Sequence, residues 1–203
     1  MKRIISSLCA VILAISAIGQ NTFEIGDLTY EITSENTVEV HDCATSATAV
    51  TIPESIVIPN NGTTYSVTAI GSNAFWSCYN LSSIEIPNSV TSIGADAFVS
   101  CTTMTNIIIP NSVTSIGNNA FQNCNKLSSI TLSNTLTSIG STTFRNCSSL
   151  SSIIIPNSVT SISLQAFLNC SSLTSVTLPE NATIEINAFY NAGKRDTING
   201  VVY

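Results

Sequence analysis

The sequence predicts a solenoid, a fold in which successive coils of one chain stack on each other around a continuous core. The stretch PNSVTSIG occurs at Pro87–Gly94 and again, unchanged, at Pro110–Gly117, and it returns at Pro156–Ser163 with only the last residue altered. Cysteines and phenylalanines follow one 23-residue period. They are Cys78, Cys101, Cys124, Cys147 and Cys170, and Phe75, Phe98, Phe121, Phe144 and Phe167, with Phe189 arriving one residue early. Agreement between independent positions indicates one repeated structural unit.

The first half of a unit, as in LSSIEIPNSVTSIGADAFVSC, predicts a short strand. Ile84 and Ile86 alternate with Ser83 and Glu85, which is typical of a strand with one buried face. Pro87 has no N–H to donate, so the strand should end there. Stacked in register, such strands would be parallel and about 4.8 Å apart, and would line one face of the solenoid.

The second half of the unit predicts a return path around the core. After a turn, Val90 and Ile93 should point inward, and Gly94 permits either a positive φ or a close approach of backbone. Ala97 and Phe98 place a small and a large residue on the far side, where we expect one helical turn. A single coil cannot bury its apolar face alone, so the same turn is expected against an identical neighbour in each copy.

The repeated pattern L-x-x-I-x-I-P-x-S-V-x-x-I-x-x-x-A-F-x-x-C resembles the BspA-type leucine-rich repeat over roughly residues 66–190. The resemblance implies a leucine-rich-repeat solenoid, an α/β-type repeat that is mostly β, with its parallel sheet on the concave face. Members of that family are secreted and surface proteins of anaerobic bacteria and some protozoa. The resemblance therefore implies adhesion or the binding of extracellular proteins, and it implies no shared catalytic residue and no cofactor.

The segment 1–19 is predicted to be a signal peptide. Lys2 and Arg3 precede an apolar run, and Ala17-Ile18-Gly19 supplies small residues at a cleavage site. Two alternatives are a transmembrane anchor and a lipid anchor on Cys9. The apolar run is short for a membrane span of about 20 residues, and Cys9 lies inside the run rather than after it. We expect a secreted or cell-surface protein without a membrane span after cleavage.

Three further segments follow. Residues 20–65 are predicted to be an N-terminal β-hairpin cap, because TFEIGDLTYEIT and IVIPNNGTTYSVTAI each contain two apolar stretches around glycine-containing turns. A solenoid needs an atypical, polar terminal unit, and seven of the twelve acidic residues fall in this segment. Residues 66–190 form the predicted solenoid. Residues 191–203 form either a C-terminal tail or a truncated cap, and the sequence does not separate the two.

Charge excludes nucleic acid as a partner. Charged residues make up only 9% of the chain, against roughly 25% in typical globular domains. Without residues 1–19 the chain keeps four basic and twelve acidic residues, a net charge of −8. Lys126 and Arg145 are the only basic residues between residue 20 and Lys194. No basic patch is available to bind phosphates.

Catalytic and metal-binding chemistry is not favoured. The periodic cysteines are best interpreted as small buried hydrophobes; disulfides between coils are the alternative, while stacked thiols do not make a tetrahedral metal cage. Cys43, in the cap, has no obvious partner. His41 is the only histidine, beside Asp42, and belongs to no nucleophile–base pattern. Any carboxylate pair for glycoside hydrolysis would have to come from the cap.

The outer face of the predicted parallel sheet is the candidate binding surface. Residues flanking each buried strand position should form two outward columns. One column is Ser83, Asn106, Ser129, Ser152 and Ser175, and the other is Glu85, Ile108, Thr131, Ile154 and Thr177. Ile108 and Ile154 stand where a solvated strand would favour threonine, which predicts apolar contact with a protein partner. The alternative is that isoleucine simply favours strands wherever it points.

The sequence therefore favours a non-catalytic, extracellular protein-binding or adhesion module, whose partners are extracellular or host proteins. The alternative is a structural spacer or surface-coat protein without a specific ligand. The first function predicts a saturable partner, and the second predicts self-association or no partner.

Overall fold

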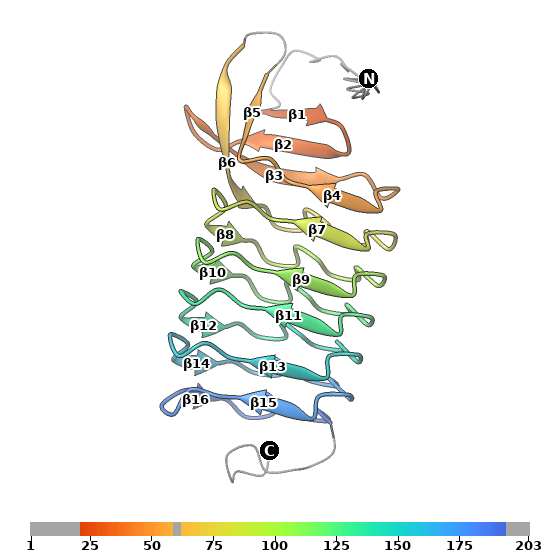
Figure 1. Ribbon diagram of the computed structural model, residues 1–203, viewed down its shortest axis with the longest axis vertical. Helices are drawn as coiled ribbons and strands as arrows, with labels where there is room; N and C mark the ends of the chain where they lie inside the picture. Colours follow the sequence, from red (N-terminus) through yellow and green to blue (C-terminus); the bar gives the residue numbers. More distant parts are fainter. Residues whose placement is uncertain (1–20, 59–61, 194–203) are drawn as a thin grey trace, which may run out of the picture.

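The computed structural model describes residues 21–58 and 62–193, which form an elongated stack of coils with a strand-rich N-terminal end (Figure 1). The predicted signal peptide and nearly all of the predicted tail or truncated cap lie outside these residues, as do the tip residues 59–61 of the second predicted hairpin. The elements of the described residues are short β-strands joined by turns.

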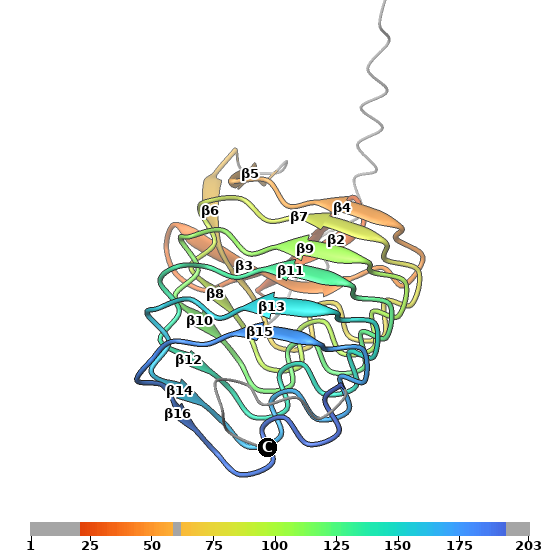
Figure 2. The ribbon, with the colours of Figure 1, turned by 60° about the horizontal axis from the view of Figure 1, so that its bottom comes forward.

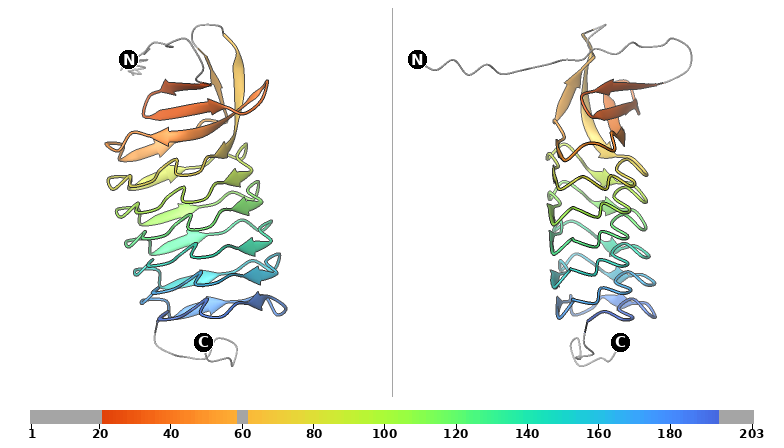
Figure 3. Two further views of the ribbon diagram at one scale, coloured as in Figure 1. Left: turned by 180° about the vertical axis from the view of Figure 1, so that it is seen from behind. Right: turned by 90° about the vertical axis from the view of Figure 1, so that its right-hand side faces the viewer.

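Two ladders of parallel strands run along the stack on different sides, as Figures 2 and 3 show. The long-strand ladder has three-residue strands: β4 (Ala49–Thr51), β7 (Ser83–Glu85), β9 (Asn106–Ile108), β11 (Ser129–Thr131), β13 (Ser152–Ile154) and β15 (Ser175–Thr177). The short-strand ladder has two-residue strands: β8 (Ser92–Ile93), β10 (Ser115–Ile116), β12 (Ser138–Ile139), β14 (Ser161–Ile162) and β16 (Thr183–Ile184). Partners such as Ile107 and Ile130 are 23 residues apart, so the predicted period is the pairing register.

Between the ladders lies a core of stacked aromatic rings. The six periodic phenylalanines are buried, and neighbouring ring centroids are 4.8–5.5 Å apart with interplanar angles of at most 15°. The periodic cysteines are buried beside them, and Ile84, Ile107 and Ile153 are buried beneath the long-strand ladder. These columns confirm the predicted core.

The predicted helical turn at Ala97-Phe98 is wrong, because the described residues contain no helix and this segment forms tight turns. Asp96 and Ser100 take positive φ values of 59° and 63°, which a right-handed helix does not allow. The N–H of Phe98 donates to the carbonyl of Ala120 in the next coil at 2.7 Å. A neighbouring coil thus supplies the hydrogen-bond acceptor that a helix would find four residues back along its own chain.

Gly94 illustrates how closely the coils approach. Its φ is not positive, so the close approach of backbone, rather than an unusual conformation, explains the glycine. A Cβ at Gly94 would lie 2.5 Å from the backbone nitrogen of Ser72 in the preceding coil, and one at Gly117 would lie 2.4 Å from that of Ala95. A side chain at these positions would push neighbouring coils apart.

The N-terminal end is a sheet that continues into the short-strand ladder. Strands β1 (Thr22–Ile25) and β2 (Leu28–Ile32) form an antiparallel hairpin, and β2 pairs antiparallel with β3 (Thr37–Cys43). Strand β5 (Ser55–Val57) pairs antiparallel with β6 (Thr64–Ile70), so both predicted hairpins are confirmed. Strand β6 pairs in parallel with β3 on one side and with β8 on the other. The two antiparallel units are therefore joined directly to the stacked coils.

Candidate functional site

The outer face of the long-strand ladder carries the predicted binding residues. In β7, β9 and β13 the central residue is buried and both flanking residues are exposed; in β11 and β15 the central residue is half-buried. Both predicted columns point outward. The first is Ser83, Asn106, Ser129, Ser152 and Ser175, and the second is Glu85, Ile108, Thr131, Ile154 and Thr177. The register aligns them, with Ile108 beside Thr131 and Ile154 beside Thr177.

Two apolar side chains on this face are exposed to an unusual degree. Ile108 and Ile154 keep 68% and 71% of their surface accessible, whereas the following residues, Ile109 and Ile155, are buried. The strand alternation sends the two members of each pair to opposite sides of the sheet. The outer face therefore presents two isolated isoleucines with the hydroxyl of Thr131 between them.

The second column has one earlier residue, Thr51, which the repeat period does not predict. Thr51 on β4 pairs with Glu85 on β7, and its Oγ1 donates to Glu85 Oε2 at 3.3 Å. Thr51 precedes Glu85 by 34 residues rather than 23, because the β5–β6 hairpin lies between them. The tetrapeptide Val50-Thr51-Ile52-Pro53, which matches the strand pattern Ile84–Pro87, was the signal that could have placed it.

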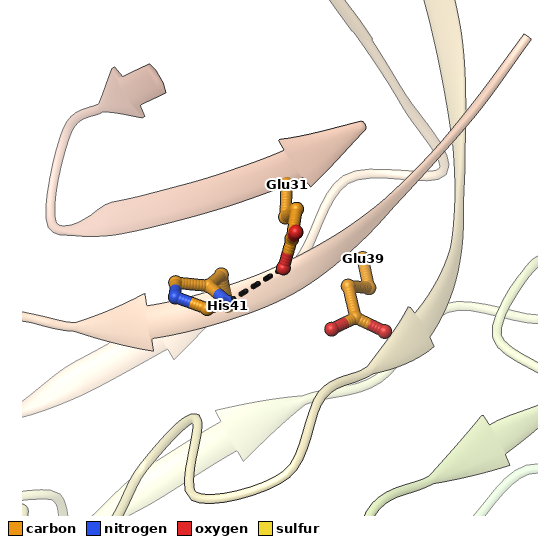
Figure 4. Close-up of side chains that lie close together, drawn as sticks. All are labelled: Glu31, Glu39 and His41. Carbon is orange, nitrogen blue, oxygen red and sulfur yellow. Dashed lines mark ion pairs between the residues drawn. The ribbon is translucent and has the colours of Figure 1, made fainter. Parts of the chain in front are cut away.

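A second group of polar side chains gathers on β2 and β3 (Figure 4). Glu31 on β2 and Glu39 on β3 are directly opposite partners in the antiparallel pairing. His41 Nδ1 lies 3.0 Å from Glu31 Oε2, and one ligand atom from each of the three residues lies within 4.8 Å of the others. His41 is therefore not isolated, although the sequence places it in no catalytic pattern. Glu39 and His41 share a face by strand alternation, and the register of β2 with β3, which the repeat period does not determine, brings Glu31 to the same face.

Burial and a neighbouring like charge both act on the carboxylate of Glu39. Partial burial raises the pKa of Glu39, the nearby charge of Glu31 raises it further, and His41 opposes the shift. The three side chains line a hollow of about 420 Å³ at the junction between the N-terminal sheet and the first coil. Gly71 and Gly94 form part of its wall.

The cysteines act as internal hydrogen-bond donors. All six cysteines of the described residues are free and buried, and for the five periodic ones this is what the packing interpretation predicts. The Sγ of Cys101, Cys124, Cys147 and Cys170 donates to the carbonyl of the phenylalanine 26 residues earlier, at 3.0–3.2 Å. Burial raises the pKa of Cys124 and of Cys170 to about 12.

Cys43 is not isolated, although the sequence analysis found no partner for it. Cys78 Sγ donates to the Cys43 carbonyl oxygen at 3.8 Å, so this carbonyl is the acceptor that a phenylalanine carbonyl provides in the later coils. The pKa of Cys43 is raised by its hydrogen bond with Cys78 and then by burial. The sequence could not show this contact because Cys43 precedes Cys78 by 35 residues, which is not the repeat period.

Exposed aromatic residues mark the turns of the first and last described coils. Trp76 and Tyr190 each follow a core phenylalanine and are 58% and 55% exposed. The repeated pattern does not predict them, because interior coils carry other residue types at this repeat position. Tyr79, four residues after Phe75, is also exposed. None of these three residues lies on a strand of the long-strand ladder.

Solved structures support the architecture. The chain is similar to a leucine-rich cell surface protein from Faecalibacterium prausnitzii, with 31% identity and a TM-score of 0.72 over 83% of this chain and 46% of that one. A T. pallidum leucine-rich repeat protein is 25% identical, with a TM-score of 0.66 over 81% of this chain and 86% of that one. A leucine-rich repeat protein from Eubacterium ventriosum is 23% identical and shares the fold, with a TM-score of 0.71 over 90% of this chain and 47% of that one.

This chain thus spans less than half of the F. prausnitzii protein that it resembles. No curated protein is significantly similar to it. Within residues 21–58 and 62–193, no helix is long and apolar enough to cross a membrane.

The repeats themselves show to which family the chain belongs. The model of the BspA-type leucine-rich repeat region matches residues 68–195 in six copies. This span contains every periodic phenylalanine and cysteine of the stacked core and covers more than half of the chain. The chain therefore belongs to the BspA-type leucine-rich repeat family.

Proposed function

We propose that the protein is a non-catalytic, extracellular protein-binding module, and that it binds through the outer face of the long-strand ladder. The observation that carries this proposal is the exposure of Ile108 and Ile154, at 68% and 71%, in the middle of an otherwise polar face. Transferring such side chains out of water on binding contributes favourably to affinity. The surrounding hydroxyls of Thr131 and Thr177 suit the polar rim of a protein interface.

The shape of the face also favours a protein partner over a small ligand. Small molecules bind mostly in concave, largely apolar pockets, whereas the column from Glu85 to Thr177 runs along successive exposed strands. The stacked phenylalanines beneath hold these strands in one register. A preorganised surface of this kind loses little conformational freedom on binding.

The proposed location is supported by similarity. The F. prausnitzii relative is described as a cell surface protein. By analogy, we place this protein at the cell surface or outside the cell, with extracellular or host proteins as its partners. Within the described repeats, Lys126 and Arg145 are the only lysine or arginine residues, and this lack of a basic surface agrees with a protein rather than a nucleic acid as the partner.

Binding to a panel of purified extracellular-matrix and serum proteins, measured by surface plasmon resonance, tests the proposal. We expect at least one saturable partner. For that partner, combining Ile108→Ser with Ile154→Ser should weaken affinity about tenfold or more, because the apolar contacts at the centre of the face are lost. Both side chains are exposed, so the unfolding midpoint should stay nearly unchanged.

The matched control combines Leu164→Ser with Ile186→Ser. These residues are also exposed and apolar, but they lie outside the long-strand ladder. The control should bind like the unmodified protein. Unaltered affinity of the Ile108 and Ile154 variant would move the site elsewhere. Self-association without any saturable partner would instead favour a structural spacer or surface coat.

A further inference from the structure

We propose that Glu31, Glu39 and His41 form a binding site for a divalent transition-metal ion, with Zn²⁺ the best match to their chemistry. This site lies in the N-terminal sheet, away from the long-strand ladder, and is independent of the proposed function. One imidazole nitrogen and two carboxylates approach each other here, with one ligand atom from each within 4.8 Å of the others (Figure 4).

The backbone brings the three side chains together. Glu31 and Glu39 face each other because their residues are paired across β2 and β3. The register shifts between Thr29 and Tyr30, so that His41 is left as the extra residue of a bulge. A bulge reorients the side chains that follow it. His41 shares a side of β3 with Glu39, two residues before it, by ordinary strand alternation. The bulge returns Cys43, which alternation would leave on that side, to the core.

This arrangement has an electrostatic cost that a bound cation would remove. Like charges directly opposite each other on neighbouring strands are destabilising. His41 pairs with Glu31. Among the residues that line the hollow, none is a lysine or arginine, and the two cations of the described repeats, Lys126 and Arg145, are not among them. A divalent ion between the carboxylates would neutralise both and bind the imidazole nitrogen as well.

Space for the ion is provided by small residues. A Cβ at Gly71 would lie only 2.6 Å from Glu39 Oε1, so the glycine leaves room for that carboxylate. The hollow of about 420 Å³ is otherwise lined by residues such as Ser72, Ser92 and Ser115. It is large enough for an ion together with bound waters, since one water occupies about 30 Å³ in the liquid.

The ligand types select the metal. Zn²⁺ binds histidine nitrogen and carboxylate oxygen at about 2.0–2.2 Å, so the ligand atoms of a tetrahedral site lie about 3.4 Å apart. His41 Nδ1 and Glu31 Oε2 are already 3.0 Å apart, and rotation of the Glu39 side chain would bring its oxygen into range. Mg²⁺ and Ca²⁺ favour sites made of oxygen ligands alone. Three protein ligands leave a coordination position for water or for a group from a partner.

The single histidine makes the proposal directly testable. His41 is the only histidine in the chain, so the imidazole signals in a ¹⁵N–¹H NMR spectrum of the full chain without a histidine tag belong to it alone. Titration with Zn²⁺ should shift these signals, with saturation at one equivalent, and should leave the nitrogen signal typical of a metal-bound Nδ1. The same titration with Mg²⁺ should produce no such shift.

Calorimetric titration with Zn²⁺ compares the affinity of variants at the proposed ligands with that of a control variant. His41→Ala and Glu39→Gln should each weaken binding about tenfold or more, because even loss of outer contacts to a metal site costs about 10–100-fold. Glu24→Gln removes a comparable exposed carboxylate on β1 and should bind like the unmodified protein. Unfolding midpoints would establish that all three variants are folded. Unchanged imidazole signals at excess Zn²⁺, or equal affinity of the His41→Ala variant, would overturn the site and assign any binding to other groups such as the cysteines.

Discussion

At the scale of single residues, the repeat is stabilised by side chains that form hydrogen bonds with the equivalent residue of the adjacent coil. Asn123, Asn146, Asn169 and Asn191 all take positive φ values, from 55° to 63°. Each of the last three donates its Nδ2–H to the Oδ1 of the preceding asparagine, at 2.7–3.2 Å. Asparagine tolerates this backbone conformation better than most residues. One side chain therefore satisfies both the turn and the contact between coils.

The cysteine column has a similar role and leads to a prediction about thiol reactivity. Thiol reagents attack the thiolate, and burial both shields the Sγ atoms and raises the pKa of Cys124 and Cys170 to about 12. At pH 8 the native protein should therefore react very slowly at the five described cysteines other than Cys78, which are buried and have a raised pKa. The hydrogen bond with Cys43 lowers the pKa of Cys78, so burial alone protects that thiol. After denaturation without a reductant, all six described cysteines should react quickly in a colorimetric thiol count.

The same thiol count would also detect a disulfide. A pair of described cysteines that stays unreactive in denaturant until a reductant is added would reveal a disulfide. That outcome would contradict the assignment of the Sγ groups as hydrogen-bond donors to the phenylalanine carbonyls.

At the scale of elements, each coil depends on its immediate neighbours. Phe121 stacks between Phe98 and Phe144, with centroid distances of 5.2 and 5.5 Å. The backbone N–H of Phe121 donates to Thr143 in the following coil. In a solenoid, stability is approximately a sum of the intrinsic terms of the coils and the interfaces between nearest neighbours. Energetic coupling should therefore fall off with the number of coils between two residues.

Double-mutant cycles in urea test this dependence. We expect Phe121→Leu and Phe144→Leu, in adjacent coils, to be non-additive in the free energy of unfolding, with a coupling of about 0.5 kcal/mol or more. Phe98→Leu and Phe167→Leu, which do not stack on each other, should add within about 0.3–0.5 kcal/mol. Leucine is used because the change to alanine in a core costs roughly 3–5 kcal/mol and risks unfolding the chain. Equal coupling in both cycles would argue against nearest-neighbour stacking.

The elements also show what the sequence could predict. The strands β7 to β15 and their outward columns were predictable because one period and one alternation determine them. The helical turn at Ala97-Phe98 was wrong because its hydrogen bonds go to the next coil, which residue preferences within one coil do not describe. The pairing of Thr51 with Glu85 was missed because a hairpin insertion sets its spacing. The approach of His41 to Glu31 was missed because the register of β2 with β3 lies outside the repeat period.

At the scale of the whole molecule, the stack presents two unlike faces (Figures 2 and 3). The short-strand ladder carries a nearly uniform column of hydroxyl residues: Ser92, Ser115, Ser138, Ser161 and Thr183. On the long-strand ladder the second column changes from an acid to isoleucine and threonine, and its isoleucines are exposed. A uniform polar column suits solvation, whereas a varied column with apolar members distinguishes one partner from another. The long-strand ladder is thus the face that we expect to bind.

The most direct measurement compares one substitution on each face of the same coil. Thr131 on β11 and Ser138 on β12 are both exposed and belong to different ladders. Thr131→Lys would place a charged side chain between Ile108 and Ile154, so affinity for the partner found by surface plasmon resonance should fall about tenfold or more. Ser138→Lys should leave the affinity unchanged, and both variants should unfold at nearly the midpoint of the unmodified protein. Equal affinities, or a loss confined to Ser138→Lys, would contradict binding through the long-strand ladder.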